Sequence, residues 1–263
     1  MNVSYDFSGR TAFITGAGSG IGRATALAFG AAGADVAVSD IAEPGGLETV
    51  KLIRAAGGSA EFFPLDVADA AAAERTVAAV VERFGRLDVA HNNAGIESEH
   101  VPFGDVDLED WRRVVEVDLN AVYYCIRAEV AVMRRQGRGA IVNTASAAGL
   151  FAGYHSGPYT AAKHGLIGLT RSAAVDHAKD GIRVNAVCPG GVDTPFVGEV
   201  PPQIVQRLML GVPMKRLASA EEIASGVLWL ASDGASYVNG VALPIDAGLT
   251  ILSAGTDFSD LDL

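Results

Sequence analysis

Short apolar runs recur along the whole chain and alternate with longer stretches in which apolar residues stand three or four positions apart. Most of the runs are continuously apolar, which is typical of strands buried on both faces of a parallel sheet. The longer stretches predict helices with one buried face, as Val77, Val80, Val81 and Phe84 illustrate. The predicted strands are residues 11–15, 34–40, 60–65, 87–92, 140–144, 182–187 and 241–245.

This alternation of strands and helices predicts an α/β fold, with one doubly wound parallel sheet and helices on both of its faces. No linker, low-complexity segment or repeat divides the chain, so residues 1–263 are expected to form a single domain. Two segments interrupt the rhythm: residues 192–216, which are rich in Pro and Gly, and the acidic tail 253–263. The predicted helices are residues 21–32, 69–84, 108–135, 159–178 and 221–231.

Composition narrows the classes of function. The formal net charge is −11, from 20 Lys and Arg against 31 Asp and Glu, which argues against nucleic acid or an anionic membrane as a partner. No apolar run reaches the roughly 18 residues of a membrane helix, and residues 1–10 lack a signal-peptide core. Cys125 and Cys188 are expected to be reduced and buried, in a cytoplasmic setting, and no His, Asp and Glu grouping has metal-ligand spacing.

The first predicted strand leads directly into a glycine-rich turn and then a helix. The turn reads Thr-Gly-Ala-Gly-Ser-Gly-Ile-Gly over residues 15–22. Glycine allows the backbone to approach a pyrophosphate closely, and the helix N-terminus offers free N–H groups and a positive dipole end. Because the turn lies between the first strand and the first helix, it predicts a dinucleotide site.

Asp40 ends the second predicted strand, 18 residues after Gly22. A carboxylate at this place can accept hydrogen bonds from the ribose hydroxyls of adenosine and would repel a 2′-phosphate. The glycine turn contains no Arg or Lys that could hold that phosphate, and Arg23 is the nearest base. The sequence therefore favours NAD over NADP.

Tyr159 and Lys163 are four residues apart in a predicted helix, so both project from one face. A tyrosine with its usual pKa of about 10 is a poor base at neutral pH, but a neighbouring ammonium stabilises the phenolate. Tyr159 is thereby a candidate general acid or base for a hydroxyl proton. Ser146 follows the fifth predicted strand, where its hydroxyl could hold the substrate oxygen.

Taken in order along the chain, these motifs resemble those of the short-chain dehydrogenase/reductase family, over about residues 7–252. The resemblance implies a Rossmann-like fold, and it makes Asn120 the helix asparagine that holds a water in a proton relay through Lys163. It also places Asp66 and Val67 at the adenine, and Val192 and Thr194 at the carboxamide. The full set expected to bind NAD is Gly16, Ser19, Gly20, Ile21, Gly22, Asp40, Ile41, Asp66, Val67, Asn93, Ala94, Gly95, Tyr159, Lys163, Pro189, Gly190, Val192 and Thr194.

The loop after the fifth strand and residues 192–216, which the family uses as a lid, supply the expected substrate pocket. This set is mostly apolar and contains no Arg or Lys, so a neutral, moderately bulky secondary alcohol or its ketone is the expected substrate. A 3-oxoacyl-(carrier) reductase and a non-catalytic NAD-binding regulatory protein remain alternatives. The candidate substrate residues are Ser146, Ala148, Phe151, Tyr154, His155, Phe196 and Met209.

Family resemblance also implies a homotetramer. The sequence adds modest support, because residues 114–133 and 227–251 carry more apolar surface than one sheet face requires. Among the remaining polar residues, His91 precedes the Asn-Asn-Ala-Gly run of residues 92–95 and is expected to be a packed strand residue rather than a catalytic one.

Overall fold

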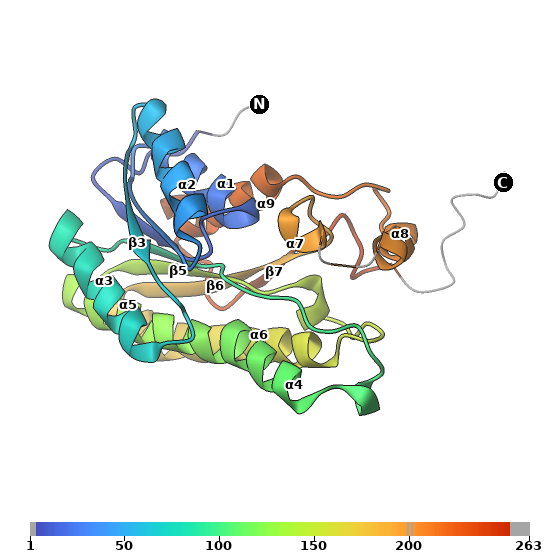
Figure 1. Cartoon of the computed structure of the whole chain (residues 1–263). Helices are drawn as coiled ribbons and strands as arrows, with labels where there is room; N and C mark the ends of the chain where they lie inside the picture. Colours follow the sequence, from blue (N-terminus) through green and yellow to red (C-terminus); the bar gives the residue numbers. More distant parts are fainter. Residues whose placement is uncertain (1–3, 199, 201, 253–263) are drawn as a thin grey trace.

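Seven parallel strands form one sheet, in the order β3-β2-β1-β4-β5-β6-β7. The computed structural model describes residues 4–198, 200 and 202–252, and Figure 1 shows its path. The acidic tail 253–263 lies outside the described residues. The strands are β1 (Thr11–Ile14), β2 (Asp35–Asp40), β3 (Ser59–Pro64), β4 (Val89–Asn92), β5 (Gly139–Thr144), β6 (Ile182–Pro189) and β7 (Ala242–Ile245).

Two layers of helices cover the sheet, one on each face (Figure 1). Helices α1, α2 and α9 pack on one face, and α3, α5 and α6 on the other. Each layer encloses its own apolar core, so both faces of every central strand are buried, as the continuous apolar runs predict. The helices are α1 (Gly20–Ala31), α2 (Glu43–Ala55), α3 (Ala70–Phe84), α4 (Leu108–Val115), α5 (Ala121–Gln136), α6 (Gly157–His177), α7 (Pro195–Gly198), α8 (Pro202–Leu210) and α9 (Ala220–Ala231).

The strand order reverses between β1 and β4. From β1 the chain proceeds outward to β2 and β3, then crosses back to β4 on the other side of β1. At such a reversal the loops that follow the two strands diverge, which leaves a crevice at the carboxyl ends of the strands. The expected single doubly wound α/β sheet is confirmed, and its predicted strands agree with the observed ones to within two residues.

Two helical segments differ from the sequence-based prediction. Helix α2 was not predicted, because Pro44, Gly45 and Gly46 in its first turn are typical of loops. Packing on the sheet stabilises this segment as a helix. A Cβ at Gly46 would lie 2.1 Å from the Phe62 ring, so glycine at this position lets α2 lie directly on β3. The predicted helix 108–135 is divided into α4 and α5 by a π-helical turn, Glu116–Asn120.

Part of the apolar surface that suggested a tetramer is used within one chain. Val122, Ile126, Val130 and Met133 of α5 are all buried against the sheet, whereas Tyr123 is half exposed. Assembly into a homotetramer therefore stays a prediction from the family resemblance. No helix in the described part of the chain is both long and apolar enough to span a membrane.

Candidate active site

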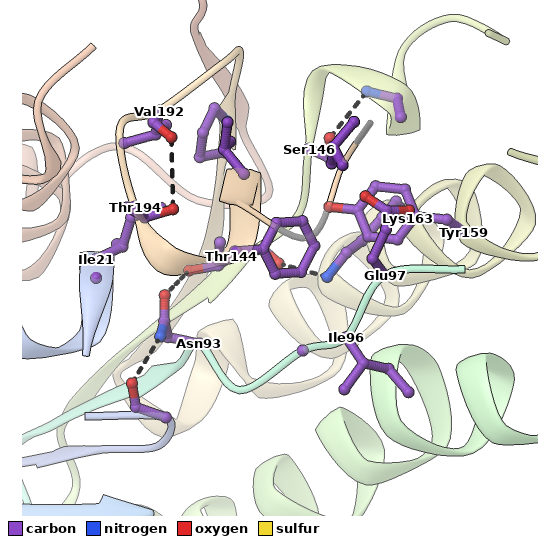
Figure 2. A pocket seen from close by; sticks show the side chains of 18 of the residues that line it. Ile21, Asn93, Ile96, Glu97, Thr144, Ser146, Tyr159, Lys163, Val192 and Thr194 are labelled. Carbon is purple, nitrogen blue, oxygen red and sulfur yellow. Dashed lines mark hydrogen bonds between the residues drawn. The ribbon is translucent and has the colours of Figure 1, made fainter. Parts of the chain in front are cut away.

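A cavity of about 900 Å³ opens at the carboxyl ends of the strands, where the strand order reverses. It extends from the glycine turn after β1, near Ile21, to Tyr159 in the first turn of α6 (Figure 2). Residues of α7 and α8 also line it. The cavity thus joins the predicted dinucleotide turn to the predicted catalytic helix.

The glycine turn is built so tightly that side chains would not fit. Gly16 and Gly20 have φ angles of +61° and +50°, a region that favours glycine. A Cβ at Gly22 would lie 2.1 Å from the carbonyl oxygen of Gly16. Gly22 therefore packs beneath the turn and does not line the cavity, whereas Gly16, Ser19, Gly20 and Ile21 do.

Helix α1 presents an open N-terminus to this cavity. Its N-cap residue, Ser19, makes no side-chain capping hydrogen bond, so the first N–H groups of the helix keep their donor capacity. These groups and the positive end of the helix dipole suit a pyrophosphate. The residues present therefore fit a dinucleotide.

Asp40 lies at the edge of the cavity next to this turn. Its carboxylate accepts hydrogen bonds of 2.8 Å from the N–H groups of Gly18 and Ala42, so the side chain is held in place. Arg23 does not line the cavity: its Nε donates to Thr49 Oγ1 at 3.0 Å, and its Nη2 donates to the carbonyl oxygens of Gly18 and Gly45. Ile41, Asp66 and Val67 also line the cavity, and contact of Asp66 and Val67 with the adenine stays a prediction from the family resemblance.

A hydrogen-bond network joins the ends of β1, β4 and β5 under the cavity. Asn93 N–H donates to Thr15 Oγ1 at 2.9 Å, and Thr144 Oγ1 donates to Asn93 Oδ1 at 3.1 Å. Since the Thr144 proton is used there, the ring nitrogen of His91, 2.8 Å away, is the donor to Thr144. Burial lowers the pKa of His91 to about 3, so this histidine stays neutral and acts in packing, as expected.

Tyr159, Lys163 and Ser146 meet at the other end of the cavity, and Figure 2 shows them together. The Nζ atom of Lys163 lies 5.3 Å from the Tyr159 ring centroid and donates to the Thr144 carbonyl oxygen at 3.2 Å. The Ser146 hydroxyl oxygen accepts from the N–H of Ala148 at 3.1 Å, which fixes its direction. The structure thus brings together three of the four residues expected to be catalytic.

The fourth, Asn120, does not lie in the cavity wall. Its amide donates to Glu116 Oε2 at 2.7 Å instead. Asp118, two residues earlier in the same π turn, is fully buried and places Oδ2 3.1 Å from Lys163 Nζ. Its Oδ1 accepts from the N–H of Ile96 at 2.8 Å. The place beside Lys163 that the resemblance gives to an asparagine is therefore held by a carboxylate, and the expectation for Asn120 is wrong.

Burial and charge set the protonation states of this cluster. Burial raises the pKa of Tyr159 to about 12; the Lys163 ammonium opposes this shift, and the charges of Asp118 and Glu97 add to it. Burial alone would lower the pKa of Lys163, but the Asp118 carboxylate and Tyr159 hold it above its usual value. Lys163 is therefore an ammonium at neutral pH, beside a phenol that carries its proton.

The substrate end of the cavity includes most of the expected residues and some that the sequence did not indicate. Met209 is not among the lining residues, although Phe196 on α7 is. Arg207 on α8 lines the cavity, so the expectation of a pocket without Arg or Lys is wrong. Arg207 stands four residues after Gln203, which also lines it, and this helical spacing puts both on the cavity face of α8. The expected substrate residues in the wall are Ser146, Ala148, Phe151, Tyr154, His155 and Phe196.

Two further lining residues come from the loop after β4: Glu97 and His100. They follow the Asn-Asn-Ala-Gly run of residues 92–95, and loops after parallel strands generally reach the ligand crevice. Their position after a predicted parallel strand could therefore have identified Glu97 and His100 as candidate site residues from the sequence. Within the described residues, no grouping of three or more His, Cys, Asp or Glu side chains is arranged to hold a metal ion.

Comparison with known proteins agrees with this geometry. A family model described as enoyl-(acyl carrier protein) reductase matches residues 16–250. The chain is 44% identical to cis-4-hydroxycyclohexanecarboxylate dehydrogenase of Sinomonas cyclohexanicum, over 93% of this chain and 98% of the relative. It is 42% identical to cyclohexanol dehydrogenase of Acinetobacter sp. (strain SE19), over 94% and 98%.

Among solved structures, levodione reductase superposes with a TM-score of 0.90 at 38% identity, covering 94% of this chain and 100% of that one. The family model, the relatives and the structural neighbour all span nearly the whole chain. The chain therefore belongs to the short-chain dehydrogenase/reductase family, whose members are oxidoreductases that use a nicotinamide cofactor.

Proposed function

We propose that this chain is an NAD-dependent dehydrogenase that interconverts a neutral, moderately bulky secondary alcohol and its ketone. One observation carries the proposal: Tyr159, Lys163 and Ser146 face the same cavity as the open N-terminus of α1. A proton-transfer group and a dinucleotide cradle thereby share one cleft of about 900 Å³, a volume that falls in the range of small-molecule sites.

The side chains of the site divide the chemistry between them. NAD, when bound, supplies the hydride acceptor. The Ser146 hydroxyl holds the substrate oxygen, and the Tyr159 phenolate oxygen takes the proton of the alcohol. Lys163 stabilises that phenolate by its charge, and Asp118 in turn keeps Lys163 protonated and in place at 3.1 Å.

The preference for NAD is proposed from the edge of the cavity at Asp40. Its fixed carboxylate is positioned to accept from ribose hydroxyls and would repel a 2′-phosphate. The Lys and Arg residues in the described cavity wall are Lys163 and Arg207, on α6 and α8, so neither belongs to the turn next to Asp40. Arg23, the nearest base in sequence, is bound to Thr49.

Two relatives act on ring alcohols by name, cyclohexanol and cis-4-hydroxycyclohexanecarboxylate. We take a cyclic secondary alcohol as the substrate class, because Phe151, Phe196 and Val197 give the cavity an apolar wall that suits a ring. Arg207 favours a second candidate within this class, a hydroxy acid whose carboxylate would meet the guanidinium.

We further propose that residues 192–216 act as a lid. Phe196 in this segment places its ring 6.1 Å from that of Tyr159, which supports a lid at the reacting end of the cavity. An apolar cover would exclude water from the hydride-transfer site.

A substrate screen tests the proposal. The purified protein would be given NAD or NADP with a panel of cyclic and open-chain secondary alcohols, and the absorbance of the reduced nicotinamide would be followed. Turnover of ring alcohols with NAD is expected. Activity confined to 3-oxoacyl thioesters would favour the carrier reductase, and NAD binding without any turnover would favour the regulatory protein.

A further inference from the structure

The loop after β4 brings two further polar side chains, Glu97 and His100, into the substrate end of the cavity, in addition to Gln203 and Arg207 of α8. Figure 2 shows Glu97 beside Tyr159 and Lys163. Neither Glu97 nor His100 has a part in the proton transfer proposed above.

The backbone around Glu97 is held on both sides, so its position is built into the fold. The N–H of Ile96 donates to Asp118 Oδ1 at 2.8 Å, and Arg113 Nη2 donates to the carbonyl oxygen of Glu97 at 2.9 Å. Two residues after Glu97, the N–H of Glu99 donates to Asp110 Oδ2 at 3.1 Å. Three anchors within residues 96–99, to α4 and the π turn, fix where the Glu97 side chain enters the cavity.

The side chains of Glu97 and His100 can make further hydrogen bonds. Glu97 Oε1 accepts from the N–H of Ser98 at 2.9 Å, and within the described residues Oε2 has no hydrogen-bond partner. The Nε2 atom of His100 is buried and likewise has none among those residues. A buried nitrogen without a partner, such as His100 Nε2, carries a desolvation cost, and a ligand group that pairs with it recovers that cost.

The chemistry of the two groups selects their ligand. A carboxylate oxygen accepts a hydrogen bond, and an imidazole nitrogen can donate or accept one, so together they match a hydroxyl group. A carboxylate on the substrate would instead be repelled by Glu97. We propose that Glu97 and His100 bind a second hydroxyl of the substrate, so that the enzyme prefers cyclic diols to simple ring alcohols. This inference rests on the proposed function, the oxidation of cyclic secondary alcohols.

The test compares kcat/KM for cyclohexanol, the 1,2-, 1,3- and 1,4-cyclohexanediols and 4-hydroxycyclohexanecarboxylate. In the wild-type protein, at least one diol is expected to exceed cyclohexanol by about ten- to hundredfold, the range for a hydrogen bond to a charged group. The diol-to-cyclohexanol ratio is the readout, because an effect of Glu97 on the pKa of Tyr159 acts on both substrates and cancels.

Three variants decide the assignment. Glu97→Leu removes the acceptor and is expected to bring the ratio close to one. Glu97→Gln keeps the size of the side chain; it is expected to lower the ratio and to raise turnover of 4-hydroxycyclohexanecarboxylate, since the repelling charge is gone. Glu99→Gln is the matched control, an exposed glutamate of the same loop outside the cavity wall, and it should leave the ratio unchanged.

The outcomes separate the two proposals. If the wild-type protein oxidises no ring alcohol, the proposed function itself fails. If kcat/KM for cyclohexanol equals or exceeds that for every diol, the second-hydroxyl site is refuted while the function stands. The same holds if kcat/KM is highest for 4-hydroxycyclohexanecarboxylate. An unchanged ratio in folded Glu97→Leu or Glu97→Gln refutes it as well, and melting temperatures and NAD binding establish that each variant is folded.

Discussion

The charge of Lys163 is expected to make Tyr159 a usable base, and its removal has a calculable effect. Lys163 Nζ lies 5.3 Å from the centre of the Tyr159 ring. At an effective dielectric constant of about 20, unit charges at that separation attract by about 3 kcal/mol. Since one pKa unit corresponds to about 1.4 kcal/mol, the ammonium lowers the pKa of the phenol by about two units. Without it, the phenolate fraction at neutral pH falls about a hundredfold.

Lys163→Met alone would leave the Asp118 carboxylate buried without its counter-ion, which destabilises a protein by about 3–5 kcal/mol. The sharper comparison is therefore between the single variant Asp118→Asn and the double variant Asp118→Asn/Lys163→Met. Residue 118 is neutral in both proteins, so the charge that differs between them is the one at position 163. The assay is kcat for alcohol oxidation from pH 6 to 10 at saturating NAD. Log kcat should rise with pH in both, with the double variant about two log units lower.

Saturating NAD matters because the family resemblance also gives Lys163 a contact with the nicotinamide ribose. Lys51→Met, an exposed lysine of α2, is the control for a change of net charge. A double variant within threefold of Asp118→Asn at every pH would refute the electrostatic role of Lys163. So would a flat pH profile, because the rate would then not depend on ionisation of Tyr159.

Four further predictions follow from the geometry. Tyr159→Phe should lower turnover by at least about a hundredfold, the usual worth of a general acid–base group, while calorimetry shows NAD binding retained. Asp40→Ala should lower the ratio of kcat/KM with NAD to kcat/KM with NADP. Residues 192–216 should exchange amide hydrogens fast in the free enzyme and more slowly with NAD and a substrate analogue; equal protection would indicate a fixed loop. Burial raises the pKa of Glu129 to about 8. Between about pH 4.5 and 8 the folded state therefore holds a proton that the unfolded state has lost, so the stability of the protein falls as pH rises. Glu129→Gln should consequently raise the melting temperature more at about pH 8 than at about pH 5.

The sequence by itself determined the features that depend on local pattern. Strands buried on both faces appear as continuous apolar runs, so the order of residues alone locates all seven strands. A glycine turn between a strand and a helix has few other uses, and the four-residue spacing of Tyr159 and Lys163 places both on one helix face wherever that helix packs. These predictions needed no knowledge of distant contacts.

Tertiary structure decided which polar residues share a cavity. Asp118 and Asn120 are two positions apart, which in a helix means nearly opposite faces, and the chain itself does not say which face meets Lys163. Packing of the π turn against α6 turned Asp118 inward and left Asn120 bonded to Glu116.

The same reason explains the residues that the sequence analysis missed or misjudged. Helix α2 forms although its first turn resembles a loop, because Gly46 lets the helix pack directly on Phe62 of β3. Glu97 reaches the cavity from a loop whose direction is fixed by contacts with Arg113 and Asp118, and Arg207 reaches it from the short helix α8. Local pattern gives the position of a side chain along the chain, whereas its direction in space depends on the elements packed around it.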